Sequence, residues 1–175
     1  MSDTVKRIKK WVEDVERYEL SEWERLPEIE LYMDQLTTYM DQQLSLFQRS
    51  GKYKLLTSSM INNYVKYGIV SRPRKKRYNR NHLSVLMIVC LLKPMLSIPN
   101  IAVLVDDEHE PMRDIYDEFC HVHMKETAEV CKRVHETKDG EKALKDLAYQ
   151  LVIEANARRI VAEKILSGFM PKQEE

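Results

Sequence analysis

Long stretches without a helix-breaking residue are the feature of this sequence that most limits its fold. The 175 residues contain 4 glycines and 6 prolines, and the prolines lie close to the ends of segments. Between them, apolar residues recur every three or four positions, which is the period of a helix with one buried face. The sequence therefore predicts an all-α fold in a chain long enough to bury a real core.

Charge is distributed unevenly along a chain whose formal net charge is zero. Residues 1–41 carry 6 basic and 11 acidic residues, and residues 106–175 carry 11 basic and 17 acidic residues. The segment between them, 42–105, has 11 basic residues and no acidic residue. Part of this segment is apolar and belongs to the expected core. Its polar part indicates a surface for a polyanion, and we expect that partner to be double-stranded DNA.

A short polar helix at 58–67 is the element that we expect to contact the DNA bases. Thr57 is its predicted N-cap, and Gly68 is the predicted left-handed residue just beyond its C-terminal end. Its exposed side chains would be Ser58, Ser59, Asn62, Asn63 and Lys66. All of them donate hydrogen bonds and none repels phosphate, so the helix is suited to the major groove, with the Ser and Asn side chains nearest the bases.

A basic segment follows this helix directly. We expect phosphate contacts from Lys66 and from Arg72, Arg74, Lys75, Lys76, Arg77, Tyr78 and Arg80. A basic run alone also occurs as a solvated loop or a localisation signal, and the neighbouring polar helix is what favours DNA. Asn79 is the predicted N-cap of the next helix, 82–93, which is apolar on nearly all sides and therefore buried.

The segment MINNYVKYGIV resembles the recognition-helix region of MerR-type transcriptional regulators. The matching positions are Ile61, Tyr64, Gly68, Ile69 and Val70. Tyr78 and Asn79 stand where that family has a tyrosine and a capping serine, and residues 95–105 resemble its next helix. The resemblance implies a MerR-like winged helix-turn-helix domain and a role in transcription regulation.

Two features differ from the MerR pattern. Asn62 occupies a position where that family usually has arginine, and residues 71–77 are short and lack the glycine of the usual wing. Most of the chain, including 26–44 and 56–64, also resembles an uncharacterised bacterial family that carries only a label as a domain of unknown function.

Three regions are expected. Residues 1–28 form an N-terminal amphipathic helix and a connection, residues 29–105 form the DNA-binding domain, and residues 106–175 form a helical hairpin. The hairpin has more apolar surface than two helices can bury against each other. We therefore expect it to pack on the DNA-binding core or to form a homodimer through 112–169.

No cofactor, metal site or enzymatic activity is expected. A cluster of possible ligands lies within one predicted helix, at Cys120, His121, His123, Cys131 and His135. Cys120 and His135 would then be about 22 Å apart at 1.5 Å per residue, too far for one zinc ion. The chain shows no phosphate-binding loop, dinucleotide-binding glycine pattern or nucleophile motif.

The expected location is the cytoplasm. The N-terminal segment lacks the apolar core of a signal peptide, the longest apolar run is too short to span a membrane, and the three cysteines are an odd number. An alternative function remains open, in which the protein is a non-enzymatic adaptor and its basic segment binds an acidic protein partner.

Overall fold

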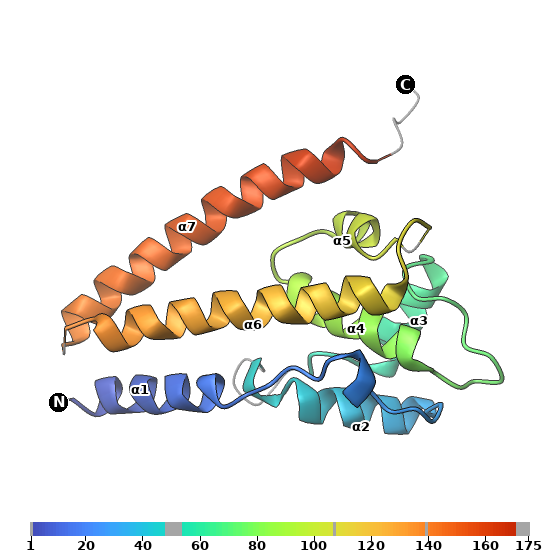
Figure 1. Cartoon of the computed structure of the whole chain (residues 1–175), viewed down its shortest axis with the longest axis horizontal. Coiled ribbons are helices and arrows are strands. Elements are labelled where there is room, and N and C mark those ends of the chain that lie inside the picture. The colour runs from blue at the N-terminus through green and yellow to red at the C-terminus, as the bar shows by residue number, and fades with distance from the viewer. Residues whose placement is uncertain (1, 48–53, 107, 139, 171–175) are drawn as a thin grey trace. The chain divides into compact units, whose positions relative to one another are not determined.

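The computed structural model describes residues 2–47, 54–106, 108–138 and 140–170. The helices in these residues are α1 (Asp3–Glu16), η1 (Trp23–Arg25), α2 (Met33–Gln43), η2 (Ser45–Phe47), α3 (Ser58–Lys66), α4 (Arg80–Leu92), α5 (Ile98–Leu104), α6 (Met112–Glu136) and α7 (Glu141–Ser167), shown in Figure 1. The described residues contain no β-strand, so the prediction of an all-α fold is confirmed.

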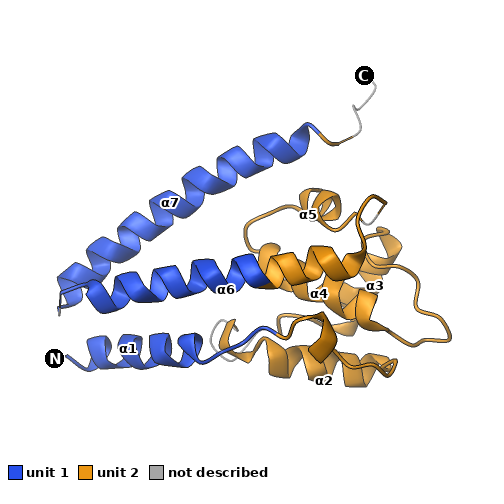
Figure 2. Cartoon of the chain, in the orientation of Figure 1, with its two compact units in different colours: residues 1–20, 121–168 blue, residues 21–120, 169–175 orange. Residues whose placement is uncertain are grey.

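The chain divides into two compact units (Figure 2). Unit 1 consists of residues 1–20 and 121–168, and unit 2 consists of residues 21–120 and 169–175. The division therefore falls within α6, after Cys120. The N-terminal helix α1 is grouped in the same unit as α7 and the C-terminal part of α6.

Unit 2 is built around α4. Every residue of this helix from His82 to Cys90 is buried, and α4 contacts both α2 and α5. A run such as Val85–Val89, apolar at five consecutive positions, has no polar side to turn toward water and is stable only when covered all round. At roughly 1.5–3 kcal/mol for each fully buried large aliphatic side chain, this helix contributes a large share of the apolar stabilisation of unit 2.

The ends of the helices in unit 2 are fixed by the side chains that the sequence predicts as N-caps. The Thr57 hydroxyl accepts a hydrogen bond from the Met60 N–H at 3.3 Å. The side-chain oxygen of Asn79, Oδ1, accepts one from the His82 N–H at 3.3 Å. Ser97 accepts from the Asn100 N–H at 3.4 Å at the start of α5. Each cap satisfies a backbone donor that the first turn of a helix leaves without a partner.

Unit 1 combines α1 with the C-terminal part of α6 and with α7. Its core contains Val12 and Val15 from α1, Cys131 and Val134 from α6, and Leu147 from α7. On α6 and α7, two arginine–glutamate pairs also connect the hairpin, Arg133–Glu154 at 2.6 Å and Arg158–Glu126 at 3.1 Å. The core is small, because it rests on three short apolar stripes rather than on a helix buried on all sides.

The wing implied by the MerR resemblance is not present in the described residues. A wing is a β-hairpin, whereas the segment between α3 and α4 contains only the isolated bridge Arg74–Arg77 and one partner, Tyr78, of the bridge to Leu31. The tight turn at Arg74–Arg77 is therefore not extended into a pair of strands. Nor is a helix-turn-helix identified in this structure.

Candidate nucleic-acid interface

The outer face of α3 carries the five polar residues that the sequence predicts. All five are exposed, namely Ser58, Ser59, Asn62, Asn63 and Lys66. On the other side of the helix, Ile61 and Tyr64 are buried within unit 2. Because Ser59, Asn62, Asn63 and Lys66 follow intervals of three and four residues, they lie on one side of the helix. Val65, on the neighbouring flank of the helix, is half-buried.

Tyr67 extends this face and was not among the predicted site residues. It is the C-cap of α3, four positions after Asn63, and its side chain is 72% exposed. An aromatic ring with a hydroxyl group is able to stack and to form hydrogen bonds. The interval of four from Asn63 was the signal in the sequence that could have identified it.

The C-terminal end of α3 has the hydrogen bonds of a Schellman motif. The Gly68 N–H donates to the Val65 carbonyl at 3.1 Å, and the Ile69 N–H donates to the Tyr64 carbonyl at 3.1 Å. Gly68 has φ +78°, a left-handed conformation that glycine adopts without steric cost. The predicted role of Gly68 as the residue that ends α3 is therefore confirmed, and the motif sets the direction in which the chain leaves the helix.

The cationic loop, defined as residues 72–77, lies in the connection from α3 to α4, which is the green loop at the right of Figure 1. Its tip is a tight turn, in which the Arg77 N–H donates to the Arg74 carbonyl at 3.0 Å. Both central residues have left-handed backbones, Lys75 with φ 51° and Lys76 with φ 61°. A positive φ at both central positions is the signature of a type I′ turn, which strongly prefers Asn-Gly.

Two consecutive left-handed lysines are energetically unfavourable. An L-residue other than glycine, asparagine or aspartate pays a steric cost of roughly 1–2 kcal/mol in this conformation. Both lysine side chains are exposed, so no burial compensates for that cost. Backbone strain of this kind is found most often at functional sites, where the side chain is needed for function although the backbone conformation is unfavourable.

The base of the loop is held to the segment before α2. Leu31 and Tyr78 exchange backbone hydrogen bonds of 2.8 Å in both directions. The Arg77 guanidinium lies over the Tyr32 ring, with 5.4 Å between its Cζ atom and the ring centroid. These contacts anchor one end of the loop while its side chains remain exposed.

Two of the predicted phosphate contacts have a different environment. Tyr78 is only 3% exposed, and its ring packs edge-on against His82 at 5.4 Å between centroids. Burial also raises the pKa of its phenol. We conclude that Tyr78 is a core residue and does not belong to the interface.

Arg80 is likewise engaged inside the protein. Its Nε donates to the Leu26 carbonyl at 3.1 Å, and its terminal nitrogens lie 3.6 Å from a Glu24 carboxylate oxygen and 3.5 Å from one of Glu28. Its side chain is 19% exposed. Arg80 therefore joins the segment before α2 to the start of α4 and has no free guanidinium edge for a phosphate.

The remaining six cations of the predicted site are different. Lys66, Arg72, Arg74, Lys75, Lys76 and Arg77 are exposed, and none forms a salt bridge with a carboxylate of the described residues. By contrast, Arg113 pairs with Glu24 at 2.8 Å and Arg159 with Glu163 at 2.7 Å. Several arginines elsewhere thus pair with carboxylates, whereas these six cations form no such pair and their own stretch of sequence, 42–105, contains no acid.

His82 links the loop to the N-terminus of α4. The Asn79 N–H lies 3.0 Å from its Nδ1 and the Ser71 hydroxyl lies 3.2 Å from its Nε2, while the Asn79 Oδ1 lies 2.7 Å from the same Nδ1. Burial lowers the pKa of this imidazole and favours the neutral form. Together with the cap at Asn79, His82 fixes where the cationic loop ends.

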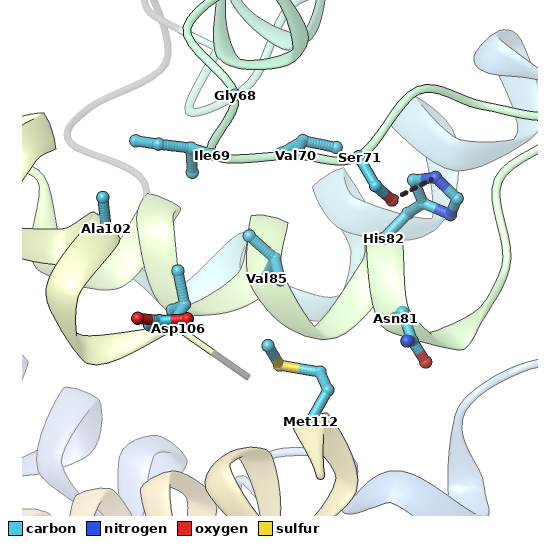
Figure 3. A pocket seen from close by; sticks show the side chains of 11 residues that line it. Gly68, Ile69, Val70, Ser71, Asn81, His82, Val85, Ala102, Asp106 and Met112 are labelled. Atoms are coloured by element: carbon cyan, nitrogen blue, oxygen red, sulfur yellow. Dashed lines mark hydrogen bonds between the residues drawn. The ribbon is translucent and has the colours of Figure 1, made fainter. Parts of the chain in front are cut away.

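A cavity of about 240 Å³ lies within unit 2, beside the segment that ends α3. In Figure 3 the side chains of Val85, Asp106 and Met112 surround it, and Ser71 and His82 form their hydrogen bond at one edge. Its lining mixes apolar groups with this polar pair.

The cysteines do not form a metal site in the described residues, where no group of three or more His, Cys, Asp or Glu side chains is placed to hold an ion. All three thiols are buried and unpaired with one another. Burial raises the pKa of Cys90 to about 12 and that of Cys120 to about 11, so both are protonated near neutral pH. None of the described helices is long and apolar enough to cross a membrane.

One comparison with known proteins returns a family. A family model described as "Domain of unknown function (DUF1836)" matches residues 21–119, which is more than half of the chain, and the chain belongs to this family. The matched region coincides closely with the continuous part of unit 2. Comparisons with curated proteins and with solved structures return no match. The family match confirms the resemblance to an uncharacterised family but gives no support to the MerR-like domain.

Proposed function

We propose that this member of the DUF1836 family is a sequence-specific DNA-binding protein that regulates transcription. In this proposal α3 enters the major groove, and Lys66 with the cations of the cationic loop contacts phosphates on either side. Tyr78 and Arg80 are omitted because their side chains are engaged in unit 2. The proposal rests on the surface itself and needs no wing.

The observation that carries the proposal is the set of six exposed cations between Lys66 and Arg77, in a stretch of sequence that contains no acidic residue. Other exposed cations such as Lys6 and Lys10 also form no salt bridge in the described residues, but they stand in a segment that contains acidic residues. A surface from which carboxylates are excluded attracts polyanions, because no internal charge competes with the phosphates. The neutral formal charge of the whole chain does not weaken this argument, since the acids lie at 1–41 and 106–175.

The size and chemistry of α3 fit a groove. An α-helix with its side chains is about 10–12 Å in diameter, which fits the major groove with its width of about 12 Å. Asn62 and Asn63 each carry an amide that is able to donate to and accept from an adenine edge at the same time. Ser58 and Ser59 lie in the first turn, where exposed backbone N–H groups also favour a phosphate oxygen.

The strained turn supports the same function. Asn-Gly in place of Lys75-Lys76 would suit a type I′ turn better, yet the protein has two cations there. A phosphate contact gives a reason for keeping lysine at these positions, because the tip of a tight turn is the part of the loop that reaches farthest from the protein.

The decisive experiment measures duplex DNA binding by fluorescence anisotropy over a range of salt concentrations. We expect the parent to bind, with log K falling linearly as log salt rises, by about 0.9 for each neutralised phosphate. The double variant Lys75→Asn/Lys76→Gly preserves the turn and removes two charges. We expect it to bind more weakly and to reduce the slope by up to about 1.8.

The matched control is Lys6→Gln/Lys10→Gln. It removes two exposed lysines of α1, so its net charge equals that of the turn variant. This control should bind DNA as the parent does. Equal binding by the parent, the turn variant and the control at every salt concentration would exclude a role for the turn in DNA binding.

Base contacts need a separate measurement. Selection of bound fragments from random duplex DNA would give a preferred site, and Asn62→Ala and Asn63→Ala would then be tested on that site and on a scrambled one. Each substitution should cost about 1–3 kcal/mol on the preferred site and little on the scrambled site. If the parent binds an acidic polypeptide but no duplex DNA, the adaptor function replaces this proposal.

A further inference from the structure

One face of α7 is largely apolar and has no partner within unit 1. Four apolar residues of this face are more than half exposed, namely Tyr149, Val152, Ile153 and Ile160, with exposed fractions from 51% to 71%. The side that packs in unit 1 is the opposite one, which contains Leu144, Leu147 and Leu151. A helix of 27 residues therefore carries two apolar stripes, and only one of them is covered within unit 1.

The central exposed residues follow the spacing of a helix–helix seam. Tyr149, Ile153, Asn156 and Ile160 are separated by four, three and four positions, which places them along one line of the helix. Val152 and Ala157 lie on either side of this line. The line has three exposed apolar side chains and one amide, Asn156, and a largely apolar line of this length is normally covered by another helix.

The charged residues on the flanks of this line indicate which helix would cover it. Lys145 and Glu163 lie on one flank, and Asp146 and Lys164 lie on the other. The two members of each pair are separated by about five complete turns at 3.6 residues per turn, so they have the same orientation around the helix. Each flank thus carries one cation and one anion, at opposite ends of the apolar line.

A second α7 in antiparallel orientation matches this pattern. In an antiparallel pair related by a two-fold axis, each flank faces the same flank of the other helix, with its ends exchanged. Lys145 of one copy then faces Glu163 of the other, and Asp146 faces Lys164. The same arrangement sets Tyr149 opposite Ile160 and Ile153 opposite Asn156, because the axis passes between residues 154 and 155.

The parallel arrangement is less favourable. Lys142 lies in line with Ile160, at the centre of the same face, because about five turns also separate these two residues. In a parallel pair Lys142 would meet Lys142 of the other copy, and the two helix dipoles would point the same way. In the antiparallel pair Lys142 lies beside the C-terminal end of the other α7, where a cation is stabilised.

We propose that two copies of this chain associate through the outer face of α7, in an antiparallel seam centred between residues 154 and 155. The inference is independent of DNA binding, because it rests on unit 1 alone. It assigns the homodimer expected from the hairpin to one helix face, from Lys142 to Ser167, and leaves the inner face of α7 in its own core.

The first test measures the oligomeric state by analytical ultracentrifugation at micromolar concentration, without DNA. We expect a dimer for the parent, and a monomer throughout would overturn the proposal. Ile160→Glu places a charge in the seam and should weaken dimerisation by more than about tenfold. Because Ile160 is 53% exposed, the folded monomer should tolerate this change.

The control is Val122→Glu on α6, an apolar residue of unit 1 that is 45% exposed but does not belong to α7. It should leave the dimer intact. A dimer that survives Ile160→Glu, or one that Val122→Glu disrupts equally, would place the contact elsewhere. Circular dichroism of each variant confirms that the helices remain folded.

Orientation is tested by cross-linking. Tyr149→Cys and Ile160→Cys variants are prepared separately, mixed and mildly oxidised. An antiparallel seam brings residue 149 of one copy next to residue 160 of the other, so only the mixture should form a disulfide dimer. Residues 149 of the two copies would be about 16 Å apart along the axis, too far for a disulfide. Cross-linking of Tyr149→Cys with itself would overturn the antiparallel seam.

Discussion

The helices α4 and α7 both carry extensive apolar surface, and they differ in how much of it is buried. In α4, nine of 13 residues are buried by neighbours within unit 2. In α7, only Leu147 and Leu166 of 27 residues are buried, and much of the remaining apolar surface is exposed. A helix covered all round by its own chain serves stability, whereas a helix covered on one side keeps a surface for another molecule. The difference predicts different responses to substitution.

The largest expected effect follows from truncating one apolar residue in each helix. Leu86→Ala removes a fully buried side chain of α4 and should lower the free energy of unfolding by about 2–5 kcal/mol, because a cavity remains. Ile153→Ala in α7 removes a side chain that is 51% exposed and should change monomer stability by less than about 0.5 kcal/mol. Urea unfolding at high dilution measures both. Similar losses for the two variants would contradict the comparison.

A smaller difference is expected for one arginine in each helix. Arg80, the first residue of α4, donates to backbone carbonyls and has a side chain only 19% exposed. Arg80→Ala should cost about 1–3 kcal/mol, since it leaves these acceptors without a charged donor. Arg158 of α7 pairs with Glu126, and the two side chains are 73% and 54% exposed. Arg158→Ala should cost at most about 1 kcal/mol, as is usual for exposed pairs. Thermal unfolding at equal protein concentration would compare them.

A pH effect is expected at the start of α4. Burial lowers the pKa of His82 from 6.5, so the unfolded chain binds more protons than the folded one just below that pH. Stability should therefore be complete above about pH 6.5 and should fall as the pH drops toward the lowered value. His82→Gln preserves an acceptor for the Asn79 N–H and should reduce this fall. Burial also lowers the pKa of His123, so part of the pH dependence should remain in the variant.

The smallest effect concerns the rate of thiol labelling. Cys90 lies in α4 with a pKa raised by burial to about 12, and Cys131 lies in the smaller core of unit 1 with its pKa also raised. Each must be uncovered before it reacts, so the rates report local opening. Mass spectrometry after exposure to iodoacetamide should show Cys131 labelled before Cys90. The opposite order would mean that unit 1 is the more stable of the two.

Local features of the fold could be predicted from the sequence. Thr57, Gly68, Asn79 and Ser97 end or begin helices as expected, because capping depends on residues three or four positions away. The roles of Tyr78 and Arg80 could not be predicted, since their partners Leu31 and Leu26 lie about 50 residues earlier in the chain. A basic or aromatic residue within a basic segment gives no sign of such distant contacts.

The burial of α7 shows a second limit of prediction from the sequence. Leu144, Leu147 and Leu151 face the core of unit 1, whereas Ile165 is 59% exposed although it lies in line with Leu147, about five turns further along. Apolar residues at intervals of three and four show which side chains share a face. They do not show how far along the helix that face is covered, because this depends on how much of α7 the partner helices of unit 1 reach.

The strained turn at Lys75 and Lys76 has a consequence for the evolution of this protein. Because asparagine and glycine fit its left-handed backbone better, a laboratory selection for heat resistance alone should replace these lysines early. A selection that also requires binding to the natural partner should retain them. The turn is thus a surface position at which thermal adaptation and function favour different residues, and the lysines of natural relatives would show which of the two has prevailed.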